Sequence, residues 1–317
     1  MDGQAMTGGM MAEMSDSAWR ARLEELGDEQ GYFEPLGRGH SAFFSDEGPV
    51  LIVSFETRAA IRAREGQMPL GYDIAREAGH SSLTLIADED SWFRDPAIYA
   101  YFDRLVDEAF FEDFDRVVFY GAGPGCGYAA AAYAVAAPGA TLIAVQPQAT
   151  LDPRVTGWDD RFRAHRRMNF TDRYGVAPQM VEGLGRAFVI FDPAQTADAM
   201  HAALFARAPV ELLQCRYLGA DIARLLTEMN VLDAMLEAAA AGEFDAATFW
   251  SLYRARRNHR RHLWTLAGQC NARGRPWLEA MLCRNVLARM SGPRFRNRLT
   301  QLEEQLAAEG RPLPETV

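Results

Sequence analysis

The chain has 317 residues, which fits one α/β domain of about 200–250 residues with a further segment. No run of about 18 apolar residues occurs, which excludes a membrane-spanning helix, and the net charge of −10 disfavours nucleic acid as a partner. The four cysteines have neither CxxC nor metal-ligand spacing. We therefore expect a cytoplasmic protein without disulfides, metal or cofactor.

The charge is unevenly distributed along the chain. Residues 251–317 contain 13 Arg and 5 Glu, a net charge of +8, whereas the first 250 residues carry −18. The basic part could bind an anionic partner or dock on the acidic part of its own chain, and the acidity of the whole chain favours docking. Residues 1–18 lack the basic start and apolar stretch of a signal peptide, so we expect a flexible tail.

Short apolar runs alternate with helical patterns over most of the chain. Two strands flank the turn at 46–49, which predicts a hairpin. The predicted strands are 41–46, 50–56, 83–87, 117–120, 141–145, 188–191 and 210–213, and the predicted helices are 95–111, about 126–136, 196–205 and 221–240. This alternation predicts a doubly wound, mainly parallel α/β sheet.

The predicted sheet domain spans residues 19–242 and contains one long segment without a clear strand. This segment, about 150–185, is predicted to form an inserted lid of short helices. Residues 243–317 are expected to form an Arg-rich helical appendage, with helices at 246–257, 259–272, 276–290 and 297–308.

Residues 117–128 read VVFYGAGPGCGY, an apolar strand that enters a glycine-rich turn before a helix. One interpretation is a dinucleotide site, in which Gly121, Gly123 and Gly125 let a pyrophosphate approach the backbone. Two features argue against this interpretation. Cys126 stands where the GxGxxG motif of dinucleotide-binding proteins has its third glycine, and Gln146 follows the next strand, where such proteins have an acidic residue that binds the ribose of the dinucleotide.

A second interpretation is a nucleophile elbow, because GAGPG has the form of the GxSxG motif between a strand and a helix. Over roughly residues 40–240 the chain resembles a branch of the α/β-hydrolase family often found beside glycosyltransferases of surface-polysaccharide synthesis. That branch carries GSSMGGYGAL, SPQYSIDP and D-x-R-W in order, where this chain has GAGPGCGYAAA, VQPQATLDP and WDDRF. The elbow here is one residue longer.

The resemblance implies a triad that this chain largely lacks. Gly123, or Pro124 in the shifted register, stands at the serine position, and Pro124 has no N–H for an oxyanion hole. Asp192 stands where the triad acid is expected, but residues 216–221 hold no histidine. The resemblance thus implies a catalytically degenerate elbow. We expect a pseudoenzyme that binds a small-molecule ligand or a protein partner, with a link to surface-glycan metabolism.

Cys126 offers a third interpretation, an enzyme with a cysteine nucleophile. It lies near a helix N-terminus, where a thiolate is favoured, and would act as hydrolase or acyltransferase with His165 or His201 as base. The simpler alternative is a small residue that packs the helix on the sheet, which we favour.

Lid residues are the candidates for binding an anionic ligand. Arginine side chains bind phosphate or sulfate through two hydrogen bonds. The alternative is a solvated lid face whose arginines pair with Asp152, Asp159 and Asp160. The predicted ligand-binding residues are Tyr128, Arg161, Arg163, Arg166 and Arg167.

Two further comparisons argue against other functions. Phosphoadenosine phosphosulfate reductases carry an SGGxDS phosphate loop and an ECGLH-like cysteine motif, and this chain has neither, since Cys270 and Cys283 lie in predicted helices. Residues 253–264 combine arginines with aromatic side chains, as nucleic-acid-binding segments do. Their helical spacing distributes them around the helix, which favours a docked or solvated helix.

Overall fold

The computed structural model describes residues 14–314 and contains one eight-stranded sheet of order β1-β2-β4-β3-β5-β6-β7-β8. Strands β3 to β8 pair in parallel, and β1 and β2 are antiparallel to their neighbours. The bounds are β1 Gly31–Leu36, β2 His40–Ser45, β3 Val50–Thr57, β4 Ser81–Ala87, β5 Arg116–Ala122, β6 Thr141–Val145, β7 Arg186–Phe191 and β8 Val210–Gln214. The predicted doubly wound, mainly parallel sheet is confirmed.

The hairpin predicted around residues 46–49 is wrong, although both of its strands form. β2 pairs with β1 on one side and with β4 on the other, and β4 separates β2 from β3. Seven of the eight residues of β3 are buried, because parallel neighbours flank the strand and helices cover its faces. The hairpin is instead formed by β1 and β2. No strand was predicted at β1, whose sequence GYFEPL has no regular alternation.

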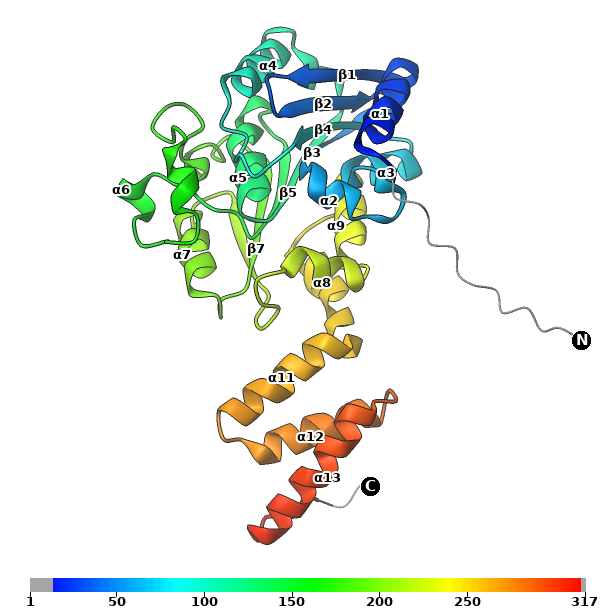
Figure 1. The fold of residues 1–317 in the computed structure, drawn as a ribbon, viewed down its shortest axis with the longest axis vertical. Coiled ribbons are helices and arrows are strands. Elements are labelled where there is room, and N and C mark those ends of the chain that lie inside the picture. Colours follow the sequence, from blue (N-terminus) through cyan, green and yellow to red (C-terminus); the bar gives the residue numbers. More distant parts are fainter. Residues whose placement is uncertain (1–13, 315–317) are drawn as a thin grey trace, which may run out of the picture.

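Helices cover both faces of the sheet (Figure 1). One face packs against α3, α8 and α9, and the other packs against α4, α5 and α7. The helices of this part are α1 Asp16–Gln30, α2 Arg58–Arg62, α3 Leu70–Ala78, α4 Pro96–Asp107, α5 Pro124–Tyr133, α6 Pro153–Thr156, α7 Thr196–Leu204, α8 Ile222–Glu228 and α9 Val231–Ala240.

Two boundaries differ from those predicted. Helix α1 begins at Asp16 and buries Trp19 and Leu23, so it overlaps the tail predicted for 1–18, of which residues 1–13 lie outside the described part. The helix predicted for 221–240 is two helices, because Asn230 adopts a left-handed conformation with φ of 55° between α8 and α9.

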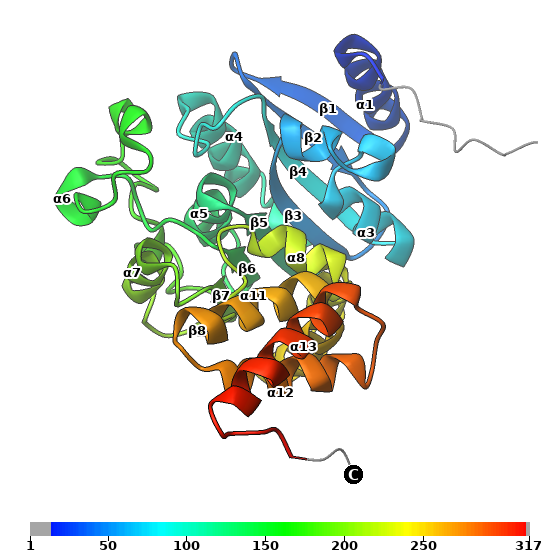
Figure 2. The ribbon, with the colours of Figure 1, turned by 60° about the horizontal axis from the view of Figure 1, so that its bottom comes forward.

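The C-terminal residues form helices α10 Ala246–Leu252, α11 Arg260–Ala272, α12 Pro276–Leu287 and α13 Pro293–Ala308. Phe249 of α10 and Tyr253 pack into the core of the sheet domain. Helices α11 to α13 pack on one another through separate apolar clusters and extend away from the sheet (Figures 1 and 2). Within residues 14–314, no helix is long and apolar enough to cross a membrane.

Candidate functional site

The glycine-rich turn lies where β5 ends and α5 begins. Gly123 connects the two with φ of 90° and ψ of 171°, and its amide donates to the Val145 carbonyl over 2.8 Å. A Cβ atom at Gly121 would lie 2.1 Å from the Cys126 carbonyl oxygen, so the first turn of the helix packs directly on the strand. The turn is therefore a tight strand-to-helix elbow.

A cavity of about 800 Å³ lies beside this elbow at the carboxyl ends of β3, β4 and β5, with Gly123 and Cys126 in its lining. A slightly larger cavity of about 840 Å³ lies at the opposite ends of the strands, beside Arg116 and Thr141. Ligands of parallel α/β sheets bind at the carboxyl ends of the strands. The cavity beside the elbow, which we call the elbow cavity, is therefore the candidate site.

The elbow cavity has an aromatic wall and a polar wall. Phe55, Trp92 and Phe93 line the first, and Gly125 packs on the Trp92 ring, which a Cβ there would meet at 3.4 Å. On the second wall the Glu56 carboxylate accepts hydrogen bonds from the Leu70 amide over 3.0 Å, from the Gly71 amide and from the Ser54 hydroxyl. Burial nevertheless raises the pKa of Glu56.

Cys126 lines the elbow cavity but is only 9% exposed. Burial, and to a lesser degree the Glu56 and Asp90 carboxylates, raise the pKa of its thiol well above the ordinary value. The group is therefore a neutral thiol at neutral pH, although a nucleophile at this position would need the thiolate.

Neither histidine predicted as a base for Cys126 hydrogen-bonds to it among the described residues. His201 accepts a bond from the Ala149 amide over 3.1 Å at Nδ1 and donates from Nε2 to Asp159 over 2.9 Å. The His165 ring packs on Trp92, with centroids 4.7 Å apart. Both ring nitrogens of His201 are engaged by other residues, and His165 makes no hydrogen bond to Cys126 within residues 14–314, so these contacts lend no support to a Cys–His pair.

Asp192 follows β7, the place of the acid in the triad motif, and is fully buried. Its carboxylate accepts hydrogen bonds from the Ala194 amide over 2.8 Å and from the Gly219 amide over 2.7 Å. Gly219 lies in the loop after β8, where a triad histidine would stand. Across residues 14–314 no histidine hydrogen-bonds to Asp192, which instead fixes this loop.

A polar network connects the lid to the sheet, and all of its members except Arg161 are buried. We use the name lid network for Gln146, Gln148, Asp159, Arg161, Asp198 and His201. The Arg161 guanidinium bridges Asp159 at 2.8 Å and Asp198 at 2.6 Å. Gln146 donates to Asp198 over 3.0 Å, and Gln148 donates to Asp159 over 3.1 Å.

Asp159 is the centre of the lid network. Burial opposes its ionisation, but hydrogen bonds from the side chain and amide of Arg161 and from His201 outweigh burial and hold its pKa well below the ordinary value. Gln148 also accepts a hydrogen bond from the Trp92 indole over 3.1 Å, which links the network to the wall of the elbow cavity. The VQPQATLDP and WDDRF segments supply four of the six side chains, but their sequence did not reveal that they bond to each other.

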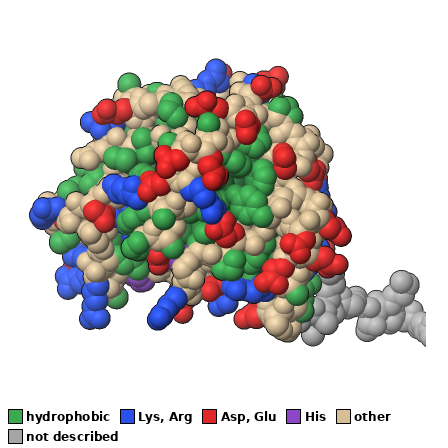
Figure 3. Space-filling view, turned by 90° about the horizontal axis from the view of Figure 1, so that it is seen from above, with side chains coloured by type: hydrophobic (Ala, Val, Ile, Leu, Met, Phe, Trp, Pro, Cys, Tyr) green, Lys and Arg blue, Asp and Glu red, His purple; other side chains and the backbone are tan. Residues whose placement is uncertain are grey.

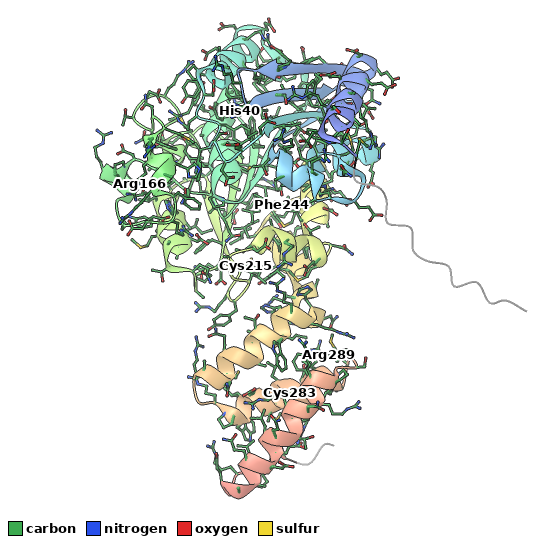
Figure 4. All side chains as sticks on the ribbon, in the orientation of Figure 1. His40, Arg166, Cys215, Phe244, Cys283 and Arg289 are labelled. Atoms are coloured by element: carbon green, nitrogen blue, oxygen red, sulfur yellow. The ribbon has the colours of Figure 1, made fainter. Side chains whose placement is uncertain are left out.

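The other predicted ligand-binding residues make internal contacts. Tyr128 is fully buried and donates to the Tyr174 carbonyl, and Arg163 pairs with Asp160 at 2.6 Å. Arg166, labelled in Figure 4, donates to the Thr156 and Asp159 carbonyls, whereas Arg167 is exposed. Arg161 belongs to the lid network described above. None of the five predicted ligand-binding side chains lines the elbow cavity. Their role in binding a ligand stays a prediction.

The predicted dinucleotide site finds little support in the hydrogen bonds of the elbow. The Gly123 amide is bonded to Val145, and Pro124 has no N–H to offer a phosphate. Gln146, in place of the ribose-binding acid, accepts a bond from the Ile222 amide over 2.9 Å. In the part of the chain that the structure describes, no three His, Cys, Asp or Glu side chains are grouped so that they could hold a metal ion.

Three features together identify the fold. They are the strand order, the antiparallel pairing of β1 and β2 at one edge of the sheet, and the elbow after β5. The chain has the α/β-hydrolase fold. No protein-family model matches the sequence, and no curated protein matches it either.

Solved structures that resemble the chain share this fold at low identity. An esterase from Rhizomucor miehei is 14% identical with a TM-score of 0.41, over 66% of this chain and 82% of its own. An esterase from Pyrobaculum calidifontis is 15% identical with a TM-score of 0.40, over 72% and 93%. The capsule O-acetyltransferase of Neisseria meningitidis serogroup A is 10% identical with a TM-score of 0.38, over 64% and 93%. At this level of similarity these neighbours give no information on activity.

Proposed function

We propose that this protein binds a ligand in the elbow cavity and does not carry out Ser–His–Asp chemistry. The observation that carries the proposal is Gly123 at the point of the elbow, where a hydrolase needs its nucleophile. Two further features support it. Pro124 removes an oxyanion-hole donor, typically worth about 3–4 kcal/mol of barrier, and the loop that Asp192 fixes holds no histidine.

A hydrolase or acyltransferase that uses Cys126 is the second candidate, favoured only by the position of the thiol in the cavity lining. Turnover of p-nitrophenyl acetate by the full chain and by Cys126→Ala separates the two. The proposal predicts a rate close to that of the buffer for both proteins. Robust turnover in the natural protein that disappears in Cys126→Ala would overturn it.

A link to surface-glycan metabolism rests on the sequence resemblance described above. The segments that carry the resemblance supply four of the six side chains of the lid network, and that network reaches Trp92 in the wall of the elbow cavity. Binding of the full chain to an array of acidic and neutral oligosaccharides tests this link, which fails if no oligosaccharide binds.

A dinucleotide would be detected in two ways. Purified protein with a bound flavin is yellow, and a nicotinamide cofactor would raise the midpoint temperature of unfolding. We expect neither, because Gly123 and Gln146 direct their polar groups to other parts of the chain.

A further inference from the structure

The elbow cavity carries an excess of negative charge. Seven acidic side chains and two arginines line it. Arg64 pairs with Asp73 at 3.2 Å, outside the lining, and Arg224 pairs with Asp221 at 2.5 Å and with Glu228 at 3.3 Å. The remaining acids, Asp90 and Asp233 among them, form no ion pair with any arginine of residues 14–314.

A tyrosine hydroxyl in the lining of this cavity has no hydrogen-bond partner within residues 14–314. Tyr120 lies on β5 and is only 3% exposed, and it contributes to the cavity lining. Its hydroxyl makes no hydrogen bond to any of the described residues. Buried hydroxyls nearly always have a partner from the protein, from water or from a ligand. The Tyr120 hydroxyl is thus open to a group that enters the cavity.

Asp233, on the first turn of α9, adds a second such atom. Its Oδ1 is buried and accepts no hydrogen bond from the described residues. Burial is the largest cause that raises the pKa of both Asp233 and Tyr120, and the Arg64 charge opposes the rise at each. Tyr120 and Asp233 both line the elbow cavity, together with Glu56.

We propose that the elbow cavity binds a small organic cation, an amine or guanidinium with an apolar body. Its N–H groups would donate to Asp233 and to the Tyr120 oxygen, because a carboxylate only accepts hydrogen bonds and the hydroxyl oxygen has unused lone pairs. Its body would lie against Phe55 and Trp92, since aromatic walls favour both apolar groups and cations. A carboxylate or phosphate ligand would meet unpaired acids. This inference rests on the proposed function, which places the ligand in this cavity.

Isothermal titration of the full chain with phenethylamine tests the proposal. The matched probes are 2-phenylethanol, which is neutral, and phenylacetate, which is anionic. Phenethylamine is expected to bind at least tenfold more tightly than either. Equal or tighter binding of a matched probe, or no binding of phenethylamine and of agmatine, a guanidinium probe, would overturn the proposal.

Two variants locate the charged group of the ligand. Asp233→Asn should weaken phenethylamine binding at least tenfold, and Tyr120→Phe, which keeps the packing, should weaken it several-fold. Asp113→Asn, an exposed acid outside the cavity, is the matched control and should change nothing. Unchanged affinity in both cavity variants contradicts the assignment, and if Asp233→Asn fails to fold, Tyr120→Phe decides alone.

The outcome is separable from that of the proposed function. Turnover that depends on Cys126 would contradict the proposed function and would leave the preference for amines in place. Tighter binding of a neutral or anionic probe would contradict the proposal that the ligand is a cation, and would leave the proposed ligand-binding function in place.

Discussion

Gly123 occupies the point of the elbow, and the space around it is open. A Cβ atom at this position would have no heavy atom within 4 Å, so a serine side chain would fit. What the residue imposes is its backbone conformation, because a φ of 90° favours glycine. The missing nucleophile is therefore not a consequence of crowding, and restoring it would not restore the base or the oxyanion donor.

The first prediction concerns Gly123→Ser. We expect the variant to fold with a loss of about 1–2 kcal/mol from the positive φ. We expect it to remain inactive, because no histidine of residues 14–314 hydrogen-bonds to the residues of the elbow. Urea unfolding gives the stability, and p-nitrophenyl acetate turnover gives the activity. Turnover well above that of the natural protein would show that a functional base exists.

Gly121 and Gly123 should respond differently to alanine. Gly121→Ala places a Cβ 2.1 Å from the Cys126 carbonyl oxygen, a backbone atom that cannot move without shifting α5. We expect a loss of more than about 3 kcal/mol, whereas Gly123→Ala should lose about 1–2 kcal/mol from its backbone conformation alone. Urea unfolding of both variants compares them, and equal losses would contradict the close packing of strand and helix.

At the scale of elements, the lid network fixes the lid to helix α7 and to the loop after β6. Between β6 and β7 the chain forms only α6 and two short 3₁₀ helices, so little regular structure holds this segment. The ion pairs of Arg161 with the buried Asp159 and Asp198 carboxylates, and the hydrogen bond between His201 and Asp159, supply the connection. Breaking one partner of such a network leaves a buried polar group unpaired.

The lid network should make stability depend on pH. Burial, the largest cause, lowers the pKa of His201 below its ordinary value of about 6.5, so the folded protein holds the neutral form. A depressed pKa gives stability that is present above pH of about 6.5 and is lost as the pH falls below it. Urea unfolding from pH 7.5 to 5 should show this loss, and His201→Gln should show a weaker pH dependence. An equal slope in both proteins would argue against the neutral His201.

The sequence predicted the elements whose own residue pattern identifies them, such as apolar runs for buried strands. It missed the helices whose apolar residues pack on strands distant in the chain. Unbroken apolar runs predicted β3, β5 and β7, because a strand buried on both faces needs no polar side. Helices α1 and α3 were not predicted, since their apolar residues become recognisable only against Phe43 and Ile86 of the sheet. The elbow and Asp192 follow from their positions after strands. Asp233 could not be placed near Tyr120, because more than a hundred residues separate them along the chain.

The described residues, 14–314, form the sheet domain and a helical extension. Acidic, basic and hydrophobic side chains are interspersed on the described part of the upper face, and no single kind covers it (Figure 3). Cys215 and Phe244 mark the lower part of the sheet domain, whereas Cys283 and Arg289 lie in the extension (Figure 4). The start of the extension contacts the sheet domain through His259, which lies 2.9 Å from Glu228. The end of α11 contacts it as well, since the Arg273 guanidinium lies over the Tyr217 ring at 5.4 Å. The basic residues therefore do not lie along the acidic domain as a whole.

Removal of residues 260–317 should leave the sheet domain folded. Leu263, Cys283 and Phe295 belong to a cluster separate from the main core, which ends with Phe249 and Tyr253. Circular dichroism during heating should show a cooperative transition within about 5 °C of that of the full chain. Phe249→Ala, as a comparison, should lower the transition much further, and loss of the transition on truncation would show that the extension is part of the core.

The central claim is that the elbow forms no covalent intermediate, and mass spectrometry of the intact protein tests it most directly. The chain is incubated with p-nitrophenyl acetate and, separately, with a fluorophosphonate at neutral pH. The account predicts an unmodified mass, because Gly123 has no side chain and the raised pKa of Cys126 keeps it a thiol. Stoichiometric acylation that is absent from Cys126→Ala would contradict it.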